Sequence, residues 1–250
     1  MTAAQLRPTT LVAWNDYIQS VESRVQSAEA SNVLWMDNVP GRRERVRSGE
    51  IIAESMNEKP SQSVPHGLIH DWIGVVFIPR VSLSDVLAIV RNYEKYGDYY
   101  GPTVRTAKLL FRSGEIDSFR IRYVRKALFT RVVLDVDYEA RYCRLNEHQW
   151  YSVARSTSVR QIQDYGETGE HALPADEGSG YIWRAFSISR LHDRDGGVYI
   201  EQESSALSRN FPLSLRWLVE PFVERLSRQL VIESLRRTRD AVVPLAVQID

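Results

Sequence analysis

The residues best suited to hold a ligand lie in two neighbouring segments near the end of the chain. Arg184 has the same parity as the apolar Phe186 and Ile188, and Gln202 has the same parity as Ile200. Alternate side chains of a β-strand share one face, so Arg184 and Gln202 face inward if these apolar residues do. A buried guanidinium is costly without an anionic partner. The pattern therefore predicts a polar anchor for a carboxylate or hydroxyl group of a ligand.

Arg184 also has two purely structural interpretations, which the sequence leaves open. Its guanidinium can form an internal ion pair with Glu201 or Glu203, and no ligand is then needed. Alternatively, the strand has the opposite parity, with Trp183 inside and Arg184 in water. The face to which this strand turns Arg184 decides between them.

Aromatic side chains are candidates to cover the apolar part of the same ligand, because ligand pockets are lined mainly by apolar and aromatic groups. We expect this role for Tyr99, Tyr138, Trp150, Phe186 and Phe222. Tyr99 belongs to a cluster of tyrosines over residues 93–100. This cluster either forms a lid over a cavity or packs helix against sheet.

The sequence carries no motif for catalysis, metal binding or a cofactor. His66 and the pair His70 and Asp71 have no further ligands at a spacing that suits a metal ion. A glycine-rich phosphate loop, a nucleophile elbow and a cysteine–histidine couple are absent from the sequence. The acidic residues at 135, 137 and 139 alternate with apolar ones and are expected to form an outer ladder with arginines of the preceding strand. We therefore expect no catalytic residue, no metal and no cofactor.

The composition limits the partners of the chain. Lysine plus arginine equals aspartate plus glutamate at 32 each in 250 residues, so no net field attracts nucleic acid. The single Cys143 excludes an internal disulfide. No apolar run approaches the roughly 20 residues that span a bilayer, and we expect a cytoplasmic protein. If the true start lies upstream, Ala3, Ala4 and Gln5 would suit the residues left after signal cleavage, and a periplasmic protein is the alternative.

The final segment offers a possible transient contact with a membrane. Its cations are Arg225, Arg228, Arg236, Arg237 and Arg239. These arginines could dock on lipid head groups. Cations near a helix C-terminus are equally favoured by the helix dipole. Both interpretations stay open, and the sequence does not indicate an oligomeric state.

Hydrophobic periodicity predicts the elements that must position these residues. Helical spacing occurs over residues 11–25, 82–90, 91–100 and 213–241, and strand-like patterns occur over 68–78, 104–111, 116–126, 130–142, 149–159, 181–191 and 198–207. A short strand is expected at residues 51 and 52, and a turn or loop at 60–65. The strands after residue 102 are joined by turn signals, so they are expected to pair as consecutive antiparallel neighbours.

Three segments within this order carry a resemblance to a known superfamily: YGDYYGPTV at residues 96–104, YIWR at 181–184 and DGGVYIE at 195–201. Together with the order of elements they resemble START and Bet v 1-like proteins (the SRPBCC superfamily), and bacterial START-like proteins in particular. The resemblance implies an α+β helix-grip domain over residues 66–243, in which a curved antiparallel sheet of about seven strands wraps the long C-terminal helix. Residues 1–65 are expected to add a helix and a strand packed on the same domain.

The resemblance implies an internal cavity for an apolar ligand. Members of this superfamily bind lipids, sterols, polyketides or hormones, and some cyclise or hydrolyse what they bind. We expect non-enzymatic binding, with or without transfer, of a lipid, sterol-like or polyketide-like ligand. The alternative is a cyclase, aromatase or hydrolase that acts on a polyketide-like substrate, which requires an inward acid or base. A third alternative is an assembly domain whose large inward side chains fill the concavity.

Overall fold

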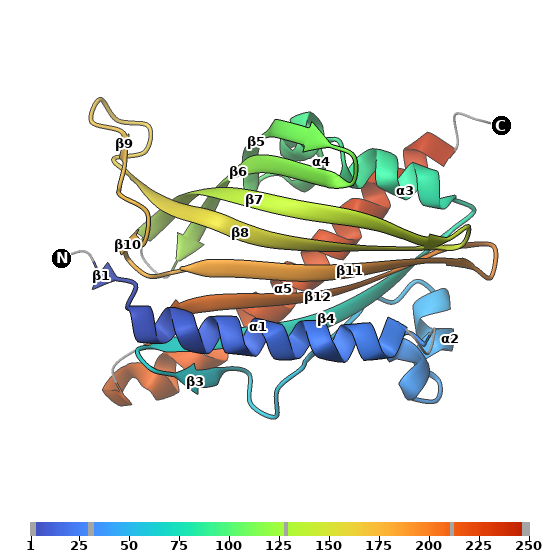
Figure 1. Cartoon of the computed structure of the whole chain (residues 1–250), viewed down its shortest axis with the longest axis horizontal. Coiled ribbons are helices and arrows are strands. Elements are labelled where there is room, and N and C mark those ends of the chain that lie inside the picture. The colour runs from blue at the N-terminus through green and yellow to red at the C-terminus, as the bar shows by residue number, and fades with distance from the viewer. Residues whose placement is uncertain (1–3, 30–32, 128–129, 211–212, 247–250) are drawn as a thin grey trace.

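A ten-stranded antiparallel sheet forms the centre of the molecule (Figure 1). The computed structural model describes residues 4–29, 33–127, 130–210 and 213–246, excluding the side chains of 27–29, 126, 127, 130, 213–224, 245 and 246. The main strands lie in the order β2 (Ile52–Ser55), β4 (Gly67–Pro79), β12 (Gly197–Arg209), β11 (Arg184–Arg194), β8 (Gln149–Gln163), β7 (Thr130–Asn146), β6 (Ile116–Ala127) and β5 (Val104–Ser113). In addition, β3 (Gln62–Val64) pairs with β4 and β9 (His171–Ala172) pairs with β8, whereas β1 (Ala4–Gln5) and β10 (Glu177–Gly178) form a separate pair.

Tight turns fix the register of the neighbouring strands. Between β11 and β12, Asp195 and Gly196 both have positive φ, 60° and 76°. Two successive left-handed residues are what a type I′ hairpin turn requires. The turn places Arg194 directly across from Gly197 and so sets which residues of β11 and β12 share a face.

One face of the sheet, which we call the inner face, is crossed by the long helix α5 (Leu213–Ala246), seen in red behind the sheet in Figure 1. The helix packs tightly on β4 at Gly74, where an added Cβ would stand 2.5 Å from Val231 Cγ1 and 2.9 Å from Leu235 Cδ1. Helix α3 (Leu83–Val90) and the short η2 (Tyr93–Lys95) and α4 (Tyr96–Tyr100) complete this layer. Ser82 starts α3 with a capping box, because Ser82 N donates to Asp85 Oδ2 at 2.8 Å.

The opposite, outer face is also covered along β4, β12 and β11. Helix α1 (Pro8–Glu29), in blue in front of the sheet in Figure 1, buries an apolar stripe against these strands. The stripe consists of Trp14, Ile18, Val21 and Val25. Beyond the end of α1, η1 (Trp35–Asn38) and α2 (Arg42–Arg47) cover Val75, Phe77 and Tyr199. This half of the sheet is therefore buried on both faces.

The predicted architecture is confirmed: an α+β fold with a large antiparallel sheet and a long C-terminal helix. The expected outer ladder is present as well, with Arg120 Nε 2.5 Å from Asp137 Oδ1 and Arg122 Nε 2.7 Å from Asp135 Oδ1. The loop predicted at residues 60–65 contains a short strand instead, because β3 extends the edge of β4. Residues 42–47 form the helix α2, which was not predicted.

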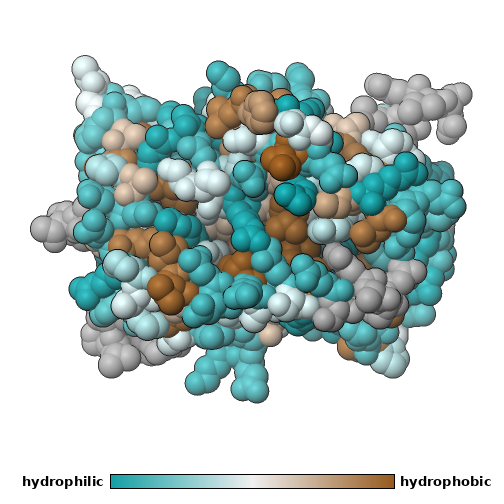
Figure 2. Space-filling model, in the orientation of Figure 1, coloured by the Kyte–Doolittle hydropathy of each residue, from teal (hydrophilic) through white to brown (hydrophobic). Residues whose placement is uncertain are grey.

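The surface on the α1 side is mostly hydrophilic, and hydrophobic side chains gather near the middle of this face (Figure 2). In the described part of the chain, no helix is both long and apolar enough to cross a membrane. The large exposed apolar residues include Leu110 and Phe111 on β5, at 46% and 62% exposure. Single exposed apolar residues of this kind are normal on soluble domains and mark no site by themselves.

Candidate functional site

Small polar side chains lie next to one another on the inner face of the sheet, the face that α5 crosses. We call this patch the polar floor; it consists of Ser152, Ser187, Ser189, Gln202 and Ser204. Ser189 lies directly across from both Ser152 and Gln202, and Ser187 lies directly across from Ser204. All five side chains keep part of their surface accessible, although their face is the one that α5 crosses. The side chains of this patch are therefore short and polar, whereas a solid core would carry large apolar ones there.

Gln202 links the polar floor to α5. Its Nε2 donates to Ser204 Oγ at 3.0 Å, and its Oε1 accepts a hydrogen bond from Ser234 Oγ of α5 at 3.3 Å. Trp72 of β4 lies directly across from Ser204, and its buried Nε1–H has no hydrogen-bond partner among the described residues. The floor therefore offers hydroxyl and amide groups to a ligand that carries oxygen atoms.

Aromatic side chains stand on the inner face beside the polar floor. Tyr138 of β7 and Tyr123 of β6 are half-buried, and their hydroxyl oxygens lie 3.4 Å apart. Trp150 of β8 packs against two groups of buried apolar residues, one that includes Leu191 and one that includes Tyr142. Tyr99 packs edge-on to Tyr100, with 6.4 Å between the ring centroids. Burial raises the pKa of Tyr123 and, further, that of Tyr138. Both phenols therefore stay protonated at neutral pH and can donate hydrogen bonds.

A cation stands near these tyrosines. Arg125 has the parity of Tyr123 on β6, and Glu233 Oε2 of α5 lies 3.8 Å from its Nη2. Burial lowers the pKa of the Arg125 guanidinium below its usual value. Among the described residues no acid lies closer to Arg125 than Glu233. The alternation of Ile121, Tyr123 and Arg125 is the sequence signal for this residue, which was not among the predicted ligand residues.

Four of the predicted ligand residues lie on the inner side of the molecule. Gln202 belongs to the polar floor, Tyr138 and Trp150 stand beside it, and Tyr99 lies on α4. The side chain of Phe222 lies outside the described residues, although its backbone is part of α5. The four residues come from four separate segments of the chain, α4, β7, β8 and β12.

Arg184 and Phe186 lie on the outer face instead, against the expectation that they share a face with Gln202. The register places Arg184 across from Leu207 and Phe186 across from Ser205, whereas Gln202 belongs to the other parity of β12. Arg184 Nη2 donates to Asp176 Oδ2 at 3.0 Å, so a carboxylate of the chain already compensates its charge. The apolar residues of β11 are buried because α1 covers them on the outer face. The sequence predicted that they are buried, and the prediction placed them on the inner face.

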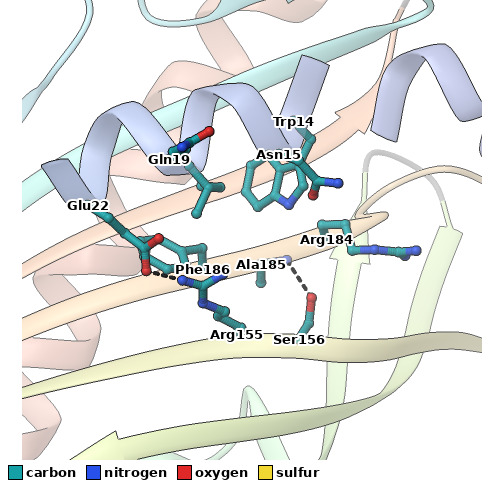
Figure 3. Close-up of a pocket in the computed structure, with 10 residues that line it drawn as sticks. Trp14, Asn15, Gln19, Glu22, Arg155, Ser156, Arg184, Ala185 and Phe186 are labelled. Carbon is teal, nitrogen blue, oxygen red and sulfur yellow. Dashed lines mark hydrogen bonds and ion pairs between the residues drawn. The ribbon is translucent and has the colours of Figure 1, made fainter. Parts of the chain in front are cut away.

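The two residues line a groove of about 440 Å³ between α1 and strands β8 and β11 (Figure 3). Its apolar side is formed by Trp14, Ile18 and Phe186. Arg155 stands over the Phe186 ring, 5.4 Å from its centroid, and pairs with Glu22 of α1. Both arginines of the groove therefore already have carboxylate partners.

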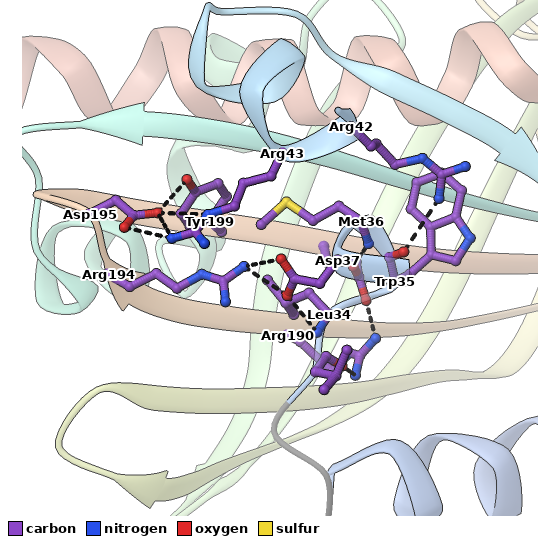
Figure 4. Close-up of polar contacts among 12 residues, drawn as sticks. Leu34, Trp35, Met36, Asp37, Arg42, Arg43, Arg190, Arg194, Asp195 and Tyr199 are labelled. Carbon is purple, nitrogen blue, oxygen red and sulfur yellow. Dashed lines mark hydrogen bonds and ion pairs between the residues drawn. The ribbon is translucent and has the colours of Figure 1, made fainter. Parts of the chain in front are cut away.

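The internal ion pairs proposed for Glu201 and Glu203 exist with other arginines. Glu201 pairs with Arg190, and Glu203 Oε1 lies 2.6 Å from Arg24 Nη2 of α1. Arg190 also donates to the Val33 carbonyl oxygen at 3.1 Å, which connects the strand to the segment of η1. Figure 4 shows this outer layer, in which further arginines of β11 and α2 pair with Asp37 and Asp195.

The order of the elements identifies the type of fold: the long strand β4 is followed by α3 and α4, then by a meander of strands, and finally by a helix on the inner face. The chain has the helix-grip fold. Helices α1, η1 and α2 are added to this arrangement on the outer face.

Solved structures with a similar arrangement have little sequence in common with this helix-grip chain. A STAR-related lipid transfer protein of Xanthomonas axonopodis is 17% identical, with a TM-score of 0.47, over 72% of this chain and 96% of that one. The protein TTHA0849 of Thermus thermophilus is 15% identical, with a TM-score of 0.48, over 69% and 97%. The Zhui aromatase/cyclase of a Streptomyces species is 9% identical, with a TM-score of 0.47, over 70% and 93%.

These values describe a general likeness of arrangement and carry nothing about the ligand or activity of this chain. No protein-family model and no curated protein sequence matches it. Function must therefore be inferred from the residues of the helix-grip chain itself.

Proposed function

We propose that the protein binds a hydrophobic ligand between the polar floor and α5, without catalysing a reaction. The observation that carries this proposal is the accessible surface of small side chains on the face that α5 crosses. A ligand that buries ~400 Å² of apolar surface there would gain on the order of 10 kcal/mol before the costs of ordering are subtracted. The tyrosines and Trp150 beside the floor supply the apolar walls for it.

The polar groups of the site favour a ligand that also carries oxygen atoms. A pure hydrocarbon placed on the polar floor would remove hydroxyls from water without replacing their hydrogen bonds, which costs roughly 1–3 kcal/mol for each group. An oxygen-bearing ligand avoids this cost at Ser187, Ser189 and Gln202. Arg125 takes over the role of polar anchor that the sequence assigned to Arg184.

Native mass spectrometry of the protein purified from its own host tests the proposal. We expect a co-purifying apolar molecule that denaturation releases. Replacing Ser187 by Phe fills the floor and should remove this molecule, whereas Ser118→Phe on the outer face of β6 should retain it. The proposal fails if no molecule is found and no member of a panel of fatty acids, sterols and aromatic polyketides raises the melting temperature.

Arg184→Ala serves as a second control in the same experiment. Because Arg184 lies on the outer face and is bound to Asp176, we expect the variant to keep the co-purifying molecule. Arg125→Gln should lose an acidic or strongly polar molecule selectively. If Arg184→Ala and Arg125→Gln had the reverse effects, the assignment of the inner face as the binding site would be wrong.

An enzymatic version, a cyclase or aromatase on the same face, rests on one observation. The paired phenols of Tyr123 and Tyr138 are protonated donors that could polarise a carbonyl group of a bound substrate. Incubation with a polyketide-like substrate distinguishes the two proposals. A product of changed mass that disappears in Tyr138→Phe supports the enzyme, and unchanged ligand recovered from the protein supports binding.

A further inference from the structure

Two buried carboxyl groups face each other beneath α1 on the outer face of the sheet. Asp71 of β4 has 0% of its surface exposed, and Glu203 of β12 has 5%. Tyr17 of α1 donates from its hydroxyl to Asp71 Oδ2 at 2.6 Å. Arg24 of α1 donates to Glu203 Oε1 at 2.6 Å and lies 3.9 Å from Asp71 Oδ2. The middle of α1 is thus attached to the sheet through both acids.

The positive charge that faces this pair is insufficient for two ionised carboxylates. From α1 the facing groups are Tyr17 and the side chain of Arg24, which is 43% exposed. From β12, Ser205 donates to Asp71 Oδ1 at 3.1 Å, and Asn57 of the loop after β2 contacts the Tyr17 hydroxyl at 3.4 Å. Glu201, a further buried acid of β12, is balanced by its own Arg190. One partly solvated guanidinium therefore serves two buried acids.

The balance is restored if the pair keeps one proton. Burial raises the pKa of Glu203 to about 8, and the neighbouring Asp71 charge adds to this shift. Burial also raises the pKa of Asp71. At neutral pH the pair then carries one negative charge, which Arg24 neutralises. Above the pKa of Glu203 the second charge appears in a site that holds no further cation among the described residues.

We propose that α1 is a proton-dependent strap, which is seated while Asp71 and Glu203 share a proton and opens locally when they lose it. Opening requires the apolar stripe of α1 to leave its strands, and Trp14 and Ile18 resist this. The surface that the strap covers includes Trp183, Ile188 and Leu207, at 4%, 3% and 0% exposure. Release of α1 would uncover this apolar face and one wall of the groove beside Arg184. The inference does not depend on what the inner face binds.

Hydrogen exchange of the full-length protein, corrected for the intrinsic pH dependence of exchange, tests the strap. Between pH 6.5 and pH 9.5 we expect the protection of amides in α1 to fall by roughly tenfold or more, relative to amides of α3. A hydrophobic dye should bind more strongly over the same range. Glu203→Gln cannot gain the second charge and should keep α1 protected at pH 9.5.

Glu22→Gln is the matched control, because Glu22 is an α1 acid whose partner, Arg155, is largely exposed. This variant should show the pH response of the unmodified protein. Asp71→Asn removes the same repulsion from the other strand and serves if Glu203→Gln does not fold. Equal protection of α1 at the two pH values, or an unchanged pH response in Glu203→Gln and Asp71→Asn, would overturn the proposal.

Discussion

Asp117 shows how a single residue holds the short tyrosine helices to the sheet. Its side chain is fully buried, and Arg91 Nη2 and Arg112 Nε lie 2.7 Å from its Oδ1. The Tyr93 hydroxyl donates to Oδ2 at 2.9 Å. The carboxylate thus connects η2 and the residue after α3 with β5 and β6, next to the inner-face tyrosines.

Asp117→Asn is expected to lower the free energy of unfolding at pH 7 by about 2 kcal/mol. Loss of one partner of a fully buried ion pair costs roughly 3–5 kcal/mol, and the partial exposure of Arg112 reduces this. Urea unfolding followed by circular dichroism measures the difference. A change below about 0.5 kcal/mol, the level of an ordinary surface substitution, would contradict this role.

The same residue predicts how stability depends on pH in acid. Burial alone would raise the pKa of Asp117, but the hydrogen bonds from Arg91, Arg112 and Tyr93 prevail and lower it. A carboxyl group with a lowered folded-state pKa stabilises the fold above its unfolded pKa of about 4, and this contribution is lost as the pH falls further. The difference between the protein and Asp117→Asn should therefore shrink from pH 6 to pH 3. If it grew over that range, the sign of the shift would be wrong.

At the scale of elements, the seat of α5 depends on Gly74. An added methyl group would meet Val231 Cγ1 at 2.5 Å and Leu235 Cδ1 at 2.9 Å, distances that real Cβ atoms do not show. We expect Gly74→Ala to destabilise the protein by about 2 kcal/mol through overpacking. Gly169→Ala is the control, because its Cβ would meet only Asp164, with Oδ2 nearest at 3.5 Å. Thermal melting should separate the two variants, and equal melting temperatures would show that α5 can move away without cost.

Strand alternation predicted the elements well and the faces of β7 correctly, since Val136 and Tyr138 lie on the inner side as expected. The faces of β11 could not be predicted in the same way. Alternation shows which face of a strand is buried, but it does not show which element buries that face. The sequence-based prediction took α5 as the covering element. On β11 the buried apolar face is covered by α1. Phe186 and Arg184 therefore lie on the outer face, and Ser187 and Ser189 lie on the inner face. Only long-range packing, which leaves no local pattern, decides this.

The same reason explains which of the predicted ligand residues lie on the inner face. The inner positions of Tyr138 and Gln202 follow from strand parity alone, because their strands turn their apolar or mixed parity toward α5. Ser204 shares the parity of Gln202, whereas Ser152, Ser187 and Ser189 look like surface residues in the sequence. The pairing of Arg184 with Asp176 joins β11 to the turn before β10 and could not be foreseen from spacing.

At the scale of the whole molecule, the N-terminal 65 residues are built into the helix-grip sheet. β2 and β3 pair with β4, α1 packs on the outer face, and η1 connects to β12 through the hydrogen bond from Met36 N to Glu201 Oε2 at 3.4 Å. Because β4 is buried by N-terminal elements on one face and by α5 on the other, the two parts share one core while α1 is seated at neutral pH. We therefore propose that residues 1–65 and 66–243 unfold together.

Differential scanning calorimetry at pH 7 should show one transition, with equal calorimetric and van't Hoff enthalpies. Near pH 9 the strap predicts a different curve, in which a small early transition precedes the main one as α1 leaves the sheet. Glu203→Gln should abolish the early transition and leave the main one in place, because the substitution removes the second buried charge without removing the apolar stripe. Two separate transitions already at pH 7 would mean that the N-terminal segment unfolds independently. In that case α1, η1 and α2 would not share a cooperative core with the rest of the fold.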